Sequence, residues 1–350
     1  MRKYFLDNLR WIIILLLFPF HTFRIYDIFE DFYIKGASNL IMSDFIVLVG
    51  FWFMSLLFVI AGISTYYSLK NRTYKEYLKE RVFRLFIPFI TGLVLLVPVQ
   101  TFFAEKFHFG FNGSYFSQLI TFFTKFGDLT GYTGGFTPGH LWFILYLFII
   151  SLSAVLVIML YKNSSIKLDF DKIGIIKIIP LFLIVLIMSP ILIGSESLGA
   201  YFALFILAYL LLSSDKIQGD LEKNKWYLIT IFLVSSAINL IIYPYWGSGI
   251  FYDCFIVFLS WMAILSLLGL GKKYLNFHNK WTDYFTKASY SIYIFHQTWI
   301  VVVAYYTLLL TSSVPLQVII ILSGSFILTI ISYEIVKRTK LTRFLFGIKE

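Results

Sequence analysis

Residues 6–23 read "LDNLRWIIILLLFPFHTF", an apolar run with a cation near its start and an imidazole near its end. The run suits a helix that crosses the apolar core of a bilayer, which takes about 17–25 residues. Arg10 and His21 lie eleven residues apart, and that interval is about three helical turns or ~16 Å of rise. At about 100° per residue, the two side chains return to within about 20° of one face. The stretch therefore predicts a membrane-spanning helix with two ionisable groups on one side.

The composition places the whole chain in the same class. It is 59% hydrophobic and only 14% charged, with a mean hydropathy of +0.82, whereas soluble domains carry about 25% charged residues. No small-residue cleavage site follows the basic start "MRKYFLDNLR", so we expect a retained first span rather than a removed signal peptide. Cys254 is the single cysteine, which excludes a disulfide framework and a thiolate metal site.

Similar apolar runs recur from end to end, so we predict an all-α polytopic membrane protein with about ten transmembrane helices. We expect one integral membrane domain over residues 1–350. The predicted spans are 11–26, 45–69, 85–104, 140–161, 173–193, 198–213, 226–243, 250–270, 288–309 and 315–336. The sixth is short, which favours a tilted or broken helix.

Basic residues fall almost entirely on one set of connections. Of the 29 Lys and Arg, all but Arg24, Lys35, Lys106 and Lys125 belong to that set. The connections concerned are the N-terminus, 70–84, 162–172, 214–225, 271–287 and the C-terminal tail. This asymmetry predicts that both termini are cytoplasmic. The net charge of +10 is then an orientation signal, and we expect no nucleic-acid partner.

Two connections have a helical pattern of their own. Within 105–139, the longest outer connection, "YFSQLITFFTKF" has apolar residues at helical spacing, which predicts a helix in the outer interface. The ending "KRTKLTRFLFGIKE" indicates a basic amphipathic segment on the inner leaflet.

Ionisable groups inside spans are costly, so each is a functional candidate. Pro19 leaves the carbonyl of Leu15 without a donor near His21. Asp7 lies one turn before Arg10, where it could pair with the guanidinium. The alternative is that Arg10 only anchors the helix and His21 is a buried, hydrogen-bonded histidine.

A second basic pair opens the third span. "ERVFRLFIPF" places Arg81 and Arg84 at i, i+3, on one face of a regular helix. Arginine suits bidentate recognition of phosphate. On the spacing alone, a positive-inside cluster is the better explanation of the pair.

Two further segments carry candidate substrate contacts. His140 and Trp142 open the fourth span from the outer side in "GHLWFILYLF". In "ASYSIYIFHQTW", Ser289, Tyr293 and His296 recur at four and three residues, which forms a polar stripe on one helix face. Such a stripe suits a water-filled cavity better than lipid. His108 and His278 lie in loops and receive no role.

Taken in order, these motifs resemble the acyltransferase-3 family of integral membrane acyltransferases. The resemblance rests on the arginine and histidine eleven residues apart, the Arg-x-x-Arg pair, "HLWF" and "SYSIYIFH". Within the family, "YFLD", "PFH" and the ending with "YEI" and "FLF" resemble the glucan biosynthesis protein C branch. The long outer loop and the short mid-chain connections depart from that branch, so the acceptor and the acyl group stay open.

The resemblance implies an acyl-CoA-dependent O-acyltransferase in a bacterial-type cell (inner) membrane. It would move an acetyl or succinyl group from cytoplasmic acyl-CoA to a carbohydrate acceptor such as an extracytoplasmic glucan. His21 and Arg10 would be catalytic, with His21 acting as general base or carrying the acyl group. Arg10, Arg81 and Arg84 would hold the phosphates of acyl-CoA, which is a donor substrate rather than a bound cofactor.

His140, Trp142, Tyr293 and His296 would contact the substrate. No metal is expected, because neither G-x-S-x-G nor H-E-x-x-H occurs. The alternative is a multispan secondary transporter with a histidine at the membrane midplane. A transporter of that kind should show paired half-repeats, and the sequence has none.

Overall fold

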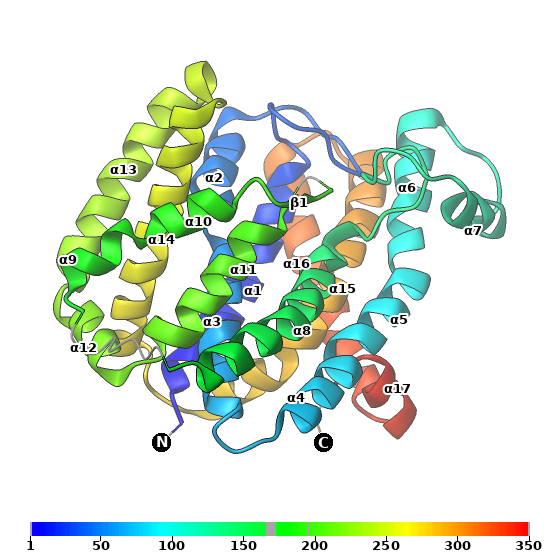
Figure 1. Cartoon of the computed structure of the whole chain (residues 1–350). Helices are drawn as coiled ribbons and strands as arrows, with labels where there is room; N and C mark the ends of the chain where they lie inside the picture. Colours follow the sequence, from blue (N-terminus) through cyan, green and yellow to red (C-terminus); the bar gives the residue numbers. More distant parts are fainter. Residues whose placement is uncertain (1, 166–172, 195, 349–350) are drawn as a thin grey trace. The chain divides into compact units, whose positions relative to one another are not determined.

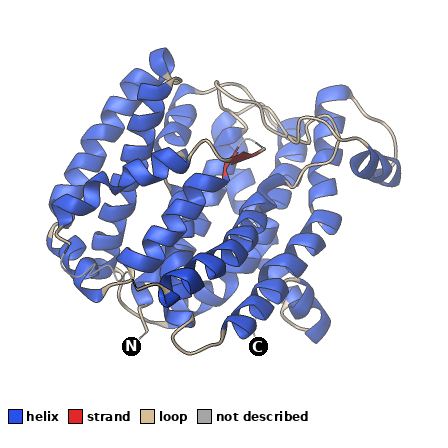
Figure 2. Cartoon of the chain, viewed as in Figure 1, coloured by secondary structure: helices blue, strands red, loops and turns tan. Residues whose placement is uncertain are grey.

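The computed structural model describes residues 2–165, 173–194 and 196–348. Its secondary structure is helical apart from one two-stranded ladder, β1 (Leu192–Ile193) paired antiparallel with β2 (Glu196–Ser197) (Figure 2). The fold is therefore all-α, as predicted. Most of the connection 162–172 lies outside the described residues.

The structure forms two compact units, each assembled from three separate stretches of the chain. Figure 1 colours the chain in sequence order, from blue at the N-terminus to red at the C-terminus. The first contains Met1–Ile13, Val47–Arg81 and Tyr146–Thr286, and the second contains Ile14–Ile46, Val82–Leu145 and Lys287–Glu350. Four helices contribute residues to both units: α1 (Tyr4–Arg24), α2 (Leu40–Gly50), α8 (Trp142–Asn163) and α15 (Lys280–Leu310).

The remaining helices belong to one unit each. Those of the first unit are α3 (Phe53–Ser68), α4 (Tyr74–Arg81), α9 (Ile175–Ile178), η4 (Ile179–Leu181), α10 (Phe182–Met188), α11 (Leu198–Leu207), η5 (Ala208–Leu212), α12 (Asp215–Lys223), α13 (Lys225–Trp246) and α14 (Ile250–Tyr274). Those of the second are η1 (Val82–Phe86), α5 (Ile87–Leu95), α6 (Val97–Phe109), α7 (Tyr115–Thr124), η2 (Gly139–Leu141), α16 (Val314–Val336) and α17 (Lys340–Leu345).

The core of the first unit depends on a close approach between α3 and α11. A Cβ atom at Gly62 would collide with the carbonyl oxygen of Phe205 and the side chain of Ala208. On either side of this glycine, α3 buries apolar residues such as Ile60 and Ile63 completely. Small residues allow helix backbones to approach in membranes, where helix packing replaces much of the hydrophobic driving force.

Eight helices in the described chain are long and apolar enough to span a membrane, or nine if the bent pair is one span. The sequence predicts about ten, and the difference lies in two segments. Residues 173–193 form only the shorter helical stretch Ile175–Met188, which Pro180 interrupts in the 3₁₀ turn η4. In the other segment, Leu198–Leu212 and Asp215–Lys223 meet at a bend of 97°. The short sixth span is thus broken, as its length indicates.

The predicted helix of the outer connection is present as α7 (Tyr115–Thr124). Ser114 caps it, accepting a hydrogen bond from the backbone N–H of Ser117. Phe116 and Ile120 are exposed one turn apart, while Phe122 is buried. This apolar outer face suits an interfacial helix, and its location in the outer leaflet stays a prediction, as does the cytoplasmic placement of both termini.

Candidate functional site

Three histidines from distant parts of the chain come together within the second unit. They are His21 on α1, His140 on the turn η2 and His296 on α15. The ring centroids of His21 and His296 lie 5.2 Å apart, and those of His140 and His296 lie 5.1 Å apart. Among the described residues, no group of three or more His, Cys, Asp or Glu side chains could hold a metal ion. We call these three residues the histidine cluster.

Glycines at two positions allow His140 to reach the cluster. Gly139 has a φ of +52°, a left-handed conformation that other residues adopt at a cost. Its backbone N–H donates to the Thr137 hydroxyl at 3.0 Å. On α5, a Cβ at Gly92 would lie only 2.7 Å from the Leu141 side chain. The turn that carries His140 therefore packs directly on α5.

Both ring nitrogens of His140 are occupied. Its Nε2 lies 2.9 Å from the carbonyl oxygen of Ile294, and since a carbonyl only accepts, Nε2 carries the proton. Its Nδ1 accepts from the side-chain amide of Gln100 at 3.2 Å. That amide also donates to Thr298 at 2.8 Å, and its oxygen accepts from Gln297 at 3.0 Å. This network fixes the tautomer of His140 and favours a structural role for it.

His296 differs from His140 because only one of its ring nitrogens has a hydrogen-bond partner. It is fully buried, and its Nδ1 lies 2.6 Å from the carbonyl oxygen of Tyr293, so Nδ1 carries the proton. Its Nε2 is buried without a hydrogen-bond partner. Tyr293 itself donates its hydroxyl proton to the backbone carbonyl of His140. Tyr293 and His296, two residues of the polar stripe predicted on this helix, therefore lie at the histidine cluster.

His21 occupies the end of α1, two residues after Pro19 within the same helix. Its ring stacks on Phe32, with 5.9 Å between centroids and 18° between planes. Its Nδ1 is also buried without a hydrogen-bond partner. Buried polar atoms are nearly always paired, so the unpaired nitrogens on these two neighbouring imidazoles mark the histidine cluster as a candidate functional site.

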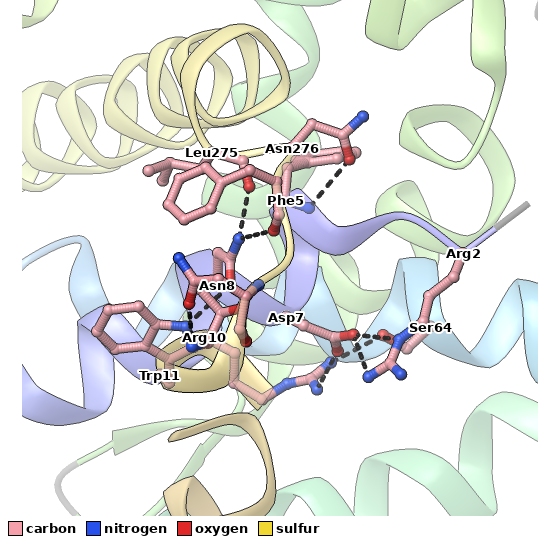
Figure 3. Close-up of polar contacts among 12 residues, drawn as sticks. Arg2, Phe5, Asp7, Asn8, Arg10, Trp11, Ser64, Leu275 and Asn276 are labelled. Atoms are coloured by element: carbon pink, nitrogen blue, oxygen red, sulfur yellow. Dashed lines mark hydrogen bonds and ion pairs between the residues drawn. The ribbon is translucent and has the colours of Figure 1, made fainter. Parts of the chain in front are cut away.

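Arg10 lies on the same helix as His21, in the stretch of α1 that belongs to the first unit. Its guanidinium donates to Asp7 and to Ser64, each at 3.1 Å (Figure 3). The predicted pairing with Asp7 is confirmed, and Asp7 also accepts from Arg2 at 2.9 Å. The two contacts hold the guanidinium fork in place, and its five N–H donors leave capacity for a further anion.

The start of α1 is itself anchored by polar contacts (Figure 3). Asn8 donates to the carbonyl oxygens of Leu275 at 2.6 Å and Phe277 at 2.9 Å. Its amide oxygen accepts from the indole N–H of Trp11 at 3.0 Å. These bonds tie the first turns of α1 to the chain that follows α14.

Arg81 and Arg84 lie in different local structures. Arg81 is the last residue of α4, and its guanidinium lies over the Tyr77 ring at 4.5 Å. Its Nε is buried without a hydrogen-bond partner. Arg84 lies in the π-helical turn η1, whose i→i+5 hydrogen bonds change the spacing of a regular helix. The π-helical turn therefore interrupts the regular i, i+3 spacing on which the prediction of a shared face was based.

Of the four predicted substrate contacts, the structure brings three together: His140, Tyr293 and His296. Trp142, the first residue of α8, stacks edge-on against its neighbour Phe143, with 6.4 Å between centroids. Contact with a substrate stays a prediction for all four residues.

Several polar residues that support these sites were not predicted from the sequence. Gln100, Gln297 and Thr298 support His140, and Ser64 holds Arg10. Gln100 follows the apolar run "LVLLVPV", and Gln297 follows His296 directly. An isolated amide inside an apolar span is as costly as a histidine when unpaired, so both glutamines carry a signal that could have identified them.

Comparison with known proteins identifies a family for this chain. The model of an acyltransferase domain matches residues 3–334. Glucans biosynthesis protein C of Escherichia coli strain K12 is 26% identical over 387 aligned positions, covering 99% of this chain and 94% of the relative. The protein of the same name from Escherichia coli O139:H28 is 25% identical over 382 positions, with the same coverage. No solved structure matches. With its family match over nearly the whole length and its many apolar helices, the chain belongs to the acyltransferase-3 family of multi-pass membrane proteins.

Proposed function

We propose that this membrane acyltransferase moves an acyl group from cytoplasmic acyl-CoA to a hydroxyl of an extracytoplasmic carbohydrate. The observation that carries the proposal is the meeting of His21 and His296 in the buried histidine cluster, inside a chain of this family. A neutral imidazole is the usual general base for a hydroxyl near neutral pH. The family match favours this function over a transporter.

In the proposed reaction, His21 removes the proton from the acceptor hydroxyl as its oxygen attacks the thioester carbonyl. The new C–O bond forms, and the C–S bond of the thioester breaks. The departing thiolate of coenzyme A takes the proton from the His21 imidazolium, which returns the histidine to its neutral form. Ester and free thiol are the products, and no oxidant or metal is required.

We assign the phosphates of acyl-CoA to the arginines. Arg10 is already oriented by Asp7 and Ser64, and Arg81 has a buried Nε without a partner. Charge-assisted hydrogen bonds from guanidinium groups suit phosphate oxygens. Arg84 joins them by the Arg-x-x-Arg spacing in the sequence.

The acceptor is proposed to be a glucan or a similar carbohydrate, with an acetyl or succinyl group transferred. Support comes from the name of the relatives, glucans biosynthesis protein C, which align along almost the whole chain. Trp142 is only partly buried and offers an aromatic surface that suits the apolar C–H faces of sugar rings.

The test is transfer by the purified protein in lipid vesicles. Radiolabelled acetyl-CoA or succinyl-CoA is supplied outside the vesicles, a glucan acceptor is enclosed within them, and the glucan is analysed by mass spectrometry. We expect an ester on the glucan and free coenzyme A in equal amounts, both absent with His21→Ala. Uptake of label into vesicles without release of coenzyme A would instead identify a transporter.

A further inference from the structure

The Nε2 atom of His296 has a defined protonation state and no partner. Since Nδ1 donates to the Tyr293 carbonyl at 2.6 Å, Nε2 of the neutral ring is a hydrogen-bond acceptor. The ring is completely buried, and Phe18 covers one side with 5.9 Å between centroids. A buried acceptor held in this way without a donor needs an explanation.

Two imidazoles face His296, and only one has a nitrogen to offer. His140 uses its Nε2 proton for Ile294 and its Nδ1 lone pair for Gln100, so it has no proton for His296. His21 has an unpartnered Nδ1, and its ring lies 5.2 Å from that of His296 at a tilt of 41°. At this separation, a rotation of the His21 ring brings a nitrogen of one ring within reach of a nitrogen of the other.

We propose that His296 is a positioning residue that sets the tautomer of His21. Its Nε2 accepts a hydrogen bond from Nδ1–H of His21, which leaves Nε2 of His21 unprotonated and directed at the acceptor hydroxyl. This inference rests on the proposed function, in which His21 is the general base.

The arrangement performs the task of the carboxylate that orients histidine in many hydrolases, but with a neutral acceptor. Inside a membrane, a buried carboxylate carries a large desolvation cost that a neutral imidazole avoids. When His21 takes up the proton of the hydroxyl, its Nδ1–H becomes a charged and stronger donor. His296 therefore stabilises the imidazolium formed during transfer as well as the tautomer that precedes it.

Three substitutions of His296 separate this role from packing. In His296→Gln, the longer amide places an acceptor near the former Nε2. In His296→Asn, the shorter amide reaches only the former Nδ1 and can still donate to the Tyr293 carbonyl. His296→Phe keeps the ring volume and removes both nitrogens.

The measurement is kcat and KM for acyl-CoA-dependent transfer in vesicles, at matched amounts of protein. We expect kcat to fall by on the order of 10²-fold in the Asn and Phe variants, with the KM for acyl-CoA unchanged. The Gln variant should recover most of the loss. If His296 acts through His21, the double variant His21→Ala/His296→Phe should transfer no more slowly than His21→Ala alone.

Parent-like kcat in both the Asn and Phe variants would overturn the inference, and so would a Gln variant as slow as Phe. A parent protein that releases no coenzyme A from acyl-CoA would instead overturn the proposed function, and this inference with it. Because His296→Phe keeps the ring volume whereas His296→Asn does not, a loss of kcat shared by both variants reports the missing acceptor and not the packing.

Discussion

The hydrogen bonds of each histidine in the cluster decide what its imidazole can do. His140 has both nitrogens engaged, by Ile294 and Gln100, so proton transfer would break an existing bond. His21 and His296 each keep one buried nitrogen without a partner. A general base needs a free lone pair within reach of the hydroxyl, which favours the proposed roles of His21 as base and His296 as its positioning residue over a role for His140 in proton transfer.

The first prediction concerns His21. His21→Ala should lower the transfer rate by about 10²–10⁴-fold, since that is the usual contribution of a general base, and should leave acyl-CoA binding intact. In the parent, the rate should rise with pH, because only the neutral imidazole accepts a proton. Transfer assays and acyl-CoA binding measured on the same preparation check both statements.

The matched control is His278→Ala, which changes an exposed histidine that stacks on Tyr4 and should keep full activity. If His296→Ala abolished transfer while His21→Ala kept more than about a tenth of it, the base would be His296.

The second prediction concerns the arginine pair. Arg81→Ala and Arg84→Ala should each weaken acyl-CoA binding by about 1.5–3 kcal/mol, the contribution of one charge-assisted hydrogen bond. Lysine at either position should rescue only part of the loss, because a point charge lacks the guanidinium fork. Isothermal titration with a non-hydrolysable acyl-CoA analogue measures the change.

Arg72→Ala is the control for this experiment. Arg72 precedes α4 and pairs with Glu80, so its loss should leave acyl-CoA binding unchanged. If the Arg81 and Arg84 variants bound acyl-CoA as tightly as the Arg72 variant, the pair would serve membrane orientation and not donor binding.

At the scale of elements, helix contacts in the first unit depend on residues without side-chain bulk. Gly62 on α3 faces the backbone of α11 at Phe205, and a Cβ there has no room. Gly219, within α12, has only the flexible end of Lys272 within contact distance, at 3.6 Å. A Cβ atom is therefore excluded at Gly62 and has room at Gly219, although both glycines are helical.

The third prediction follows from that difference. Gly62→Ala should lower the free energy of unfolding by about 1–3 kcal/mol, because the added methyl group pushes α3 away from α11. Gly219→Ala should be neutral or stabilising by up to about 1 kcal/mol, since alanine favours a helix. Thermal melting in detergent compares the two, and equal Tm values would show that α3 and α11 separate without cost.

At the scale of the whole molecule, the uneven distribution of Lys and Arg predicts the direction of insertion. All but four of the 29 basic residues belong to one set of connections, and such connections stay on the cytoplasmic side. The exposed apolar residues of α7, Phe116 and Ile120 among them, suit the opposite surface.

The fourth prediction tests this topology. In a Cys254→Ser background, a cysteine at Asn112, an exposed polar position of the outer connection, should react with a membrane-impermeant maleimide in intact cells. A cysteine at Lys75 should react only after permeabilisation. Both positions are exposed in the structure, so access differs only by membrane side, and the reverse labelling pattern would invert the topology.

Local features of this protein could be predicted from the sequence. The apolar runs are long enough to specify membrane helices without reference to the rest of the chain, and all but two predicted spans correspond to such helices. The pair Asp7 and Arg10 is confirmed, because residues three apart on one helix are neighbours whatever surrounds them. The short run after Leu198 indicated a tilted or broken helix, in agreement with the observed bend of 97°, whereas no pattern in the sequence indicated the π-helical turn at Arg84.

The chemistry of the histidines was decided by the tertiary structure. The meeting of His21, His140 and His296 joins segments far apart in the chain, and no periodicity relates one segment to another. The tautomers of His140 and His296 depend on which carbonyl lies beside each ring, Ile294 or Tyr293. The sequence determines which ionisable groups enter the membrane, whereas the proton on each ring is placed by backbone carbonyls that only the folded chain positions.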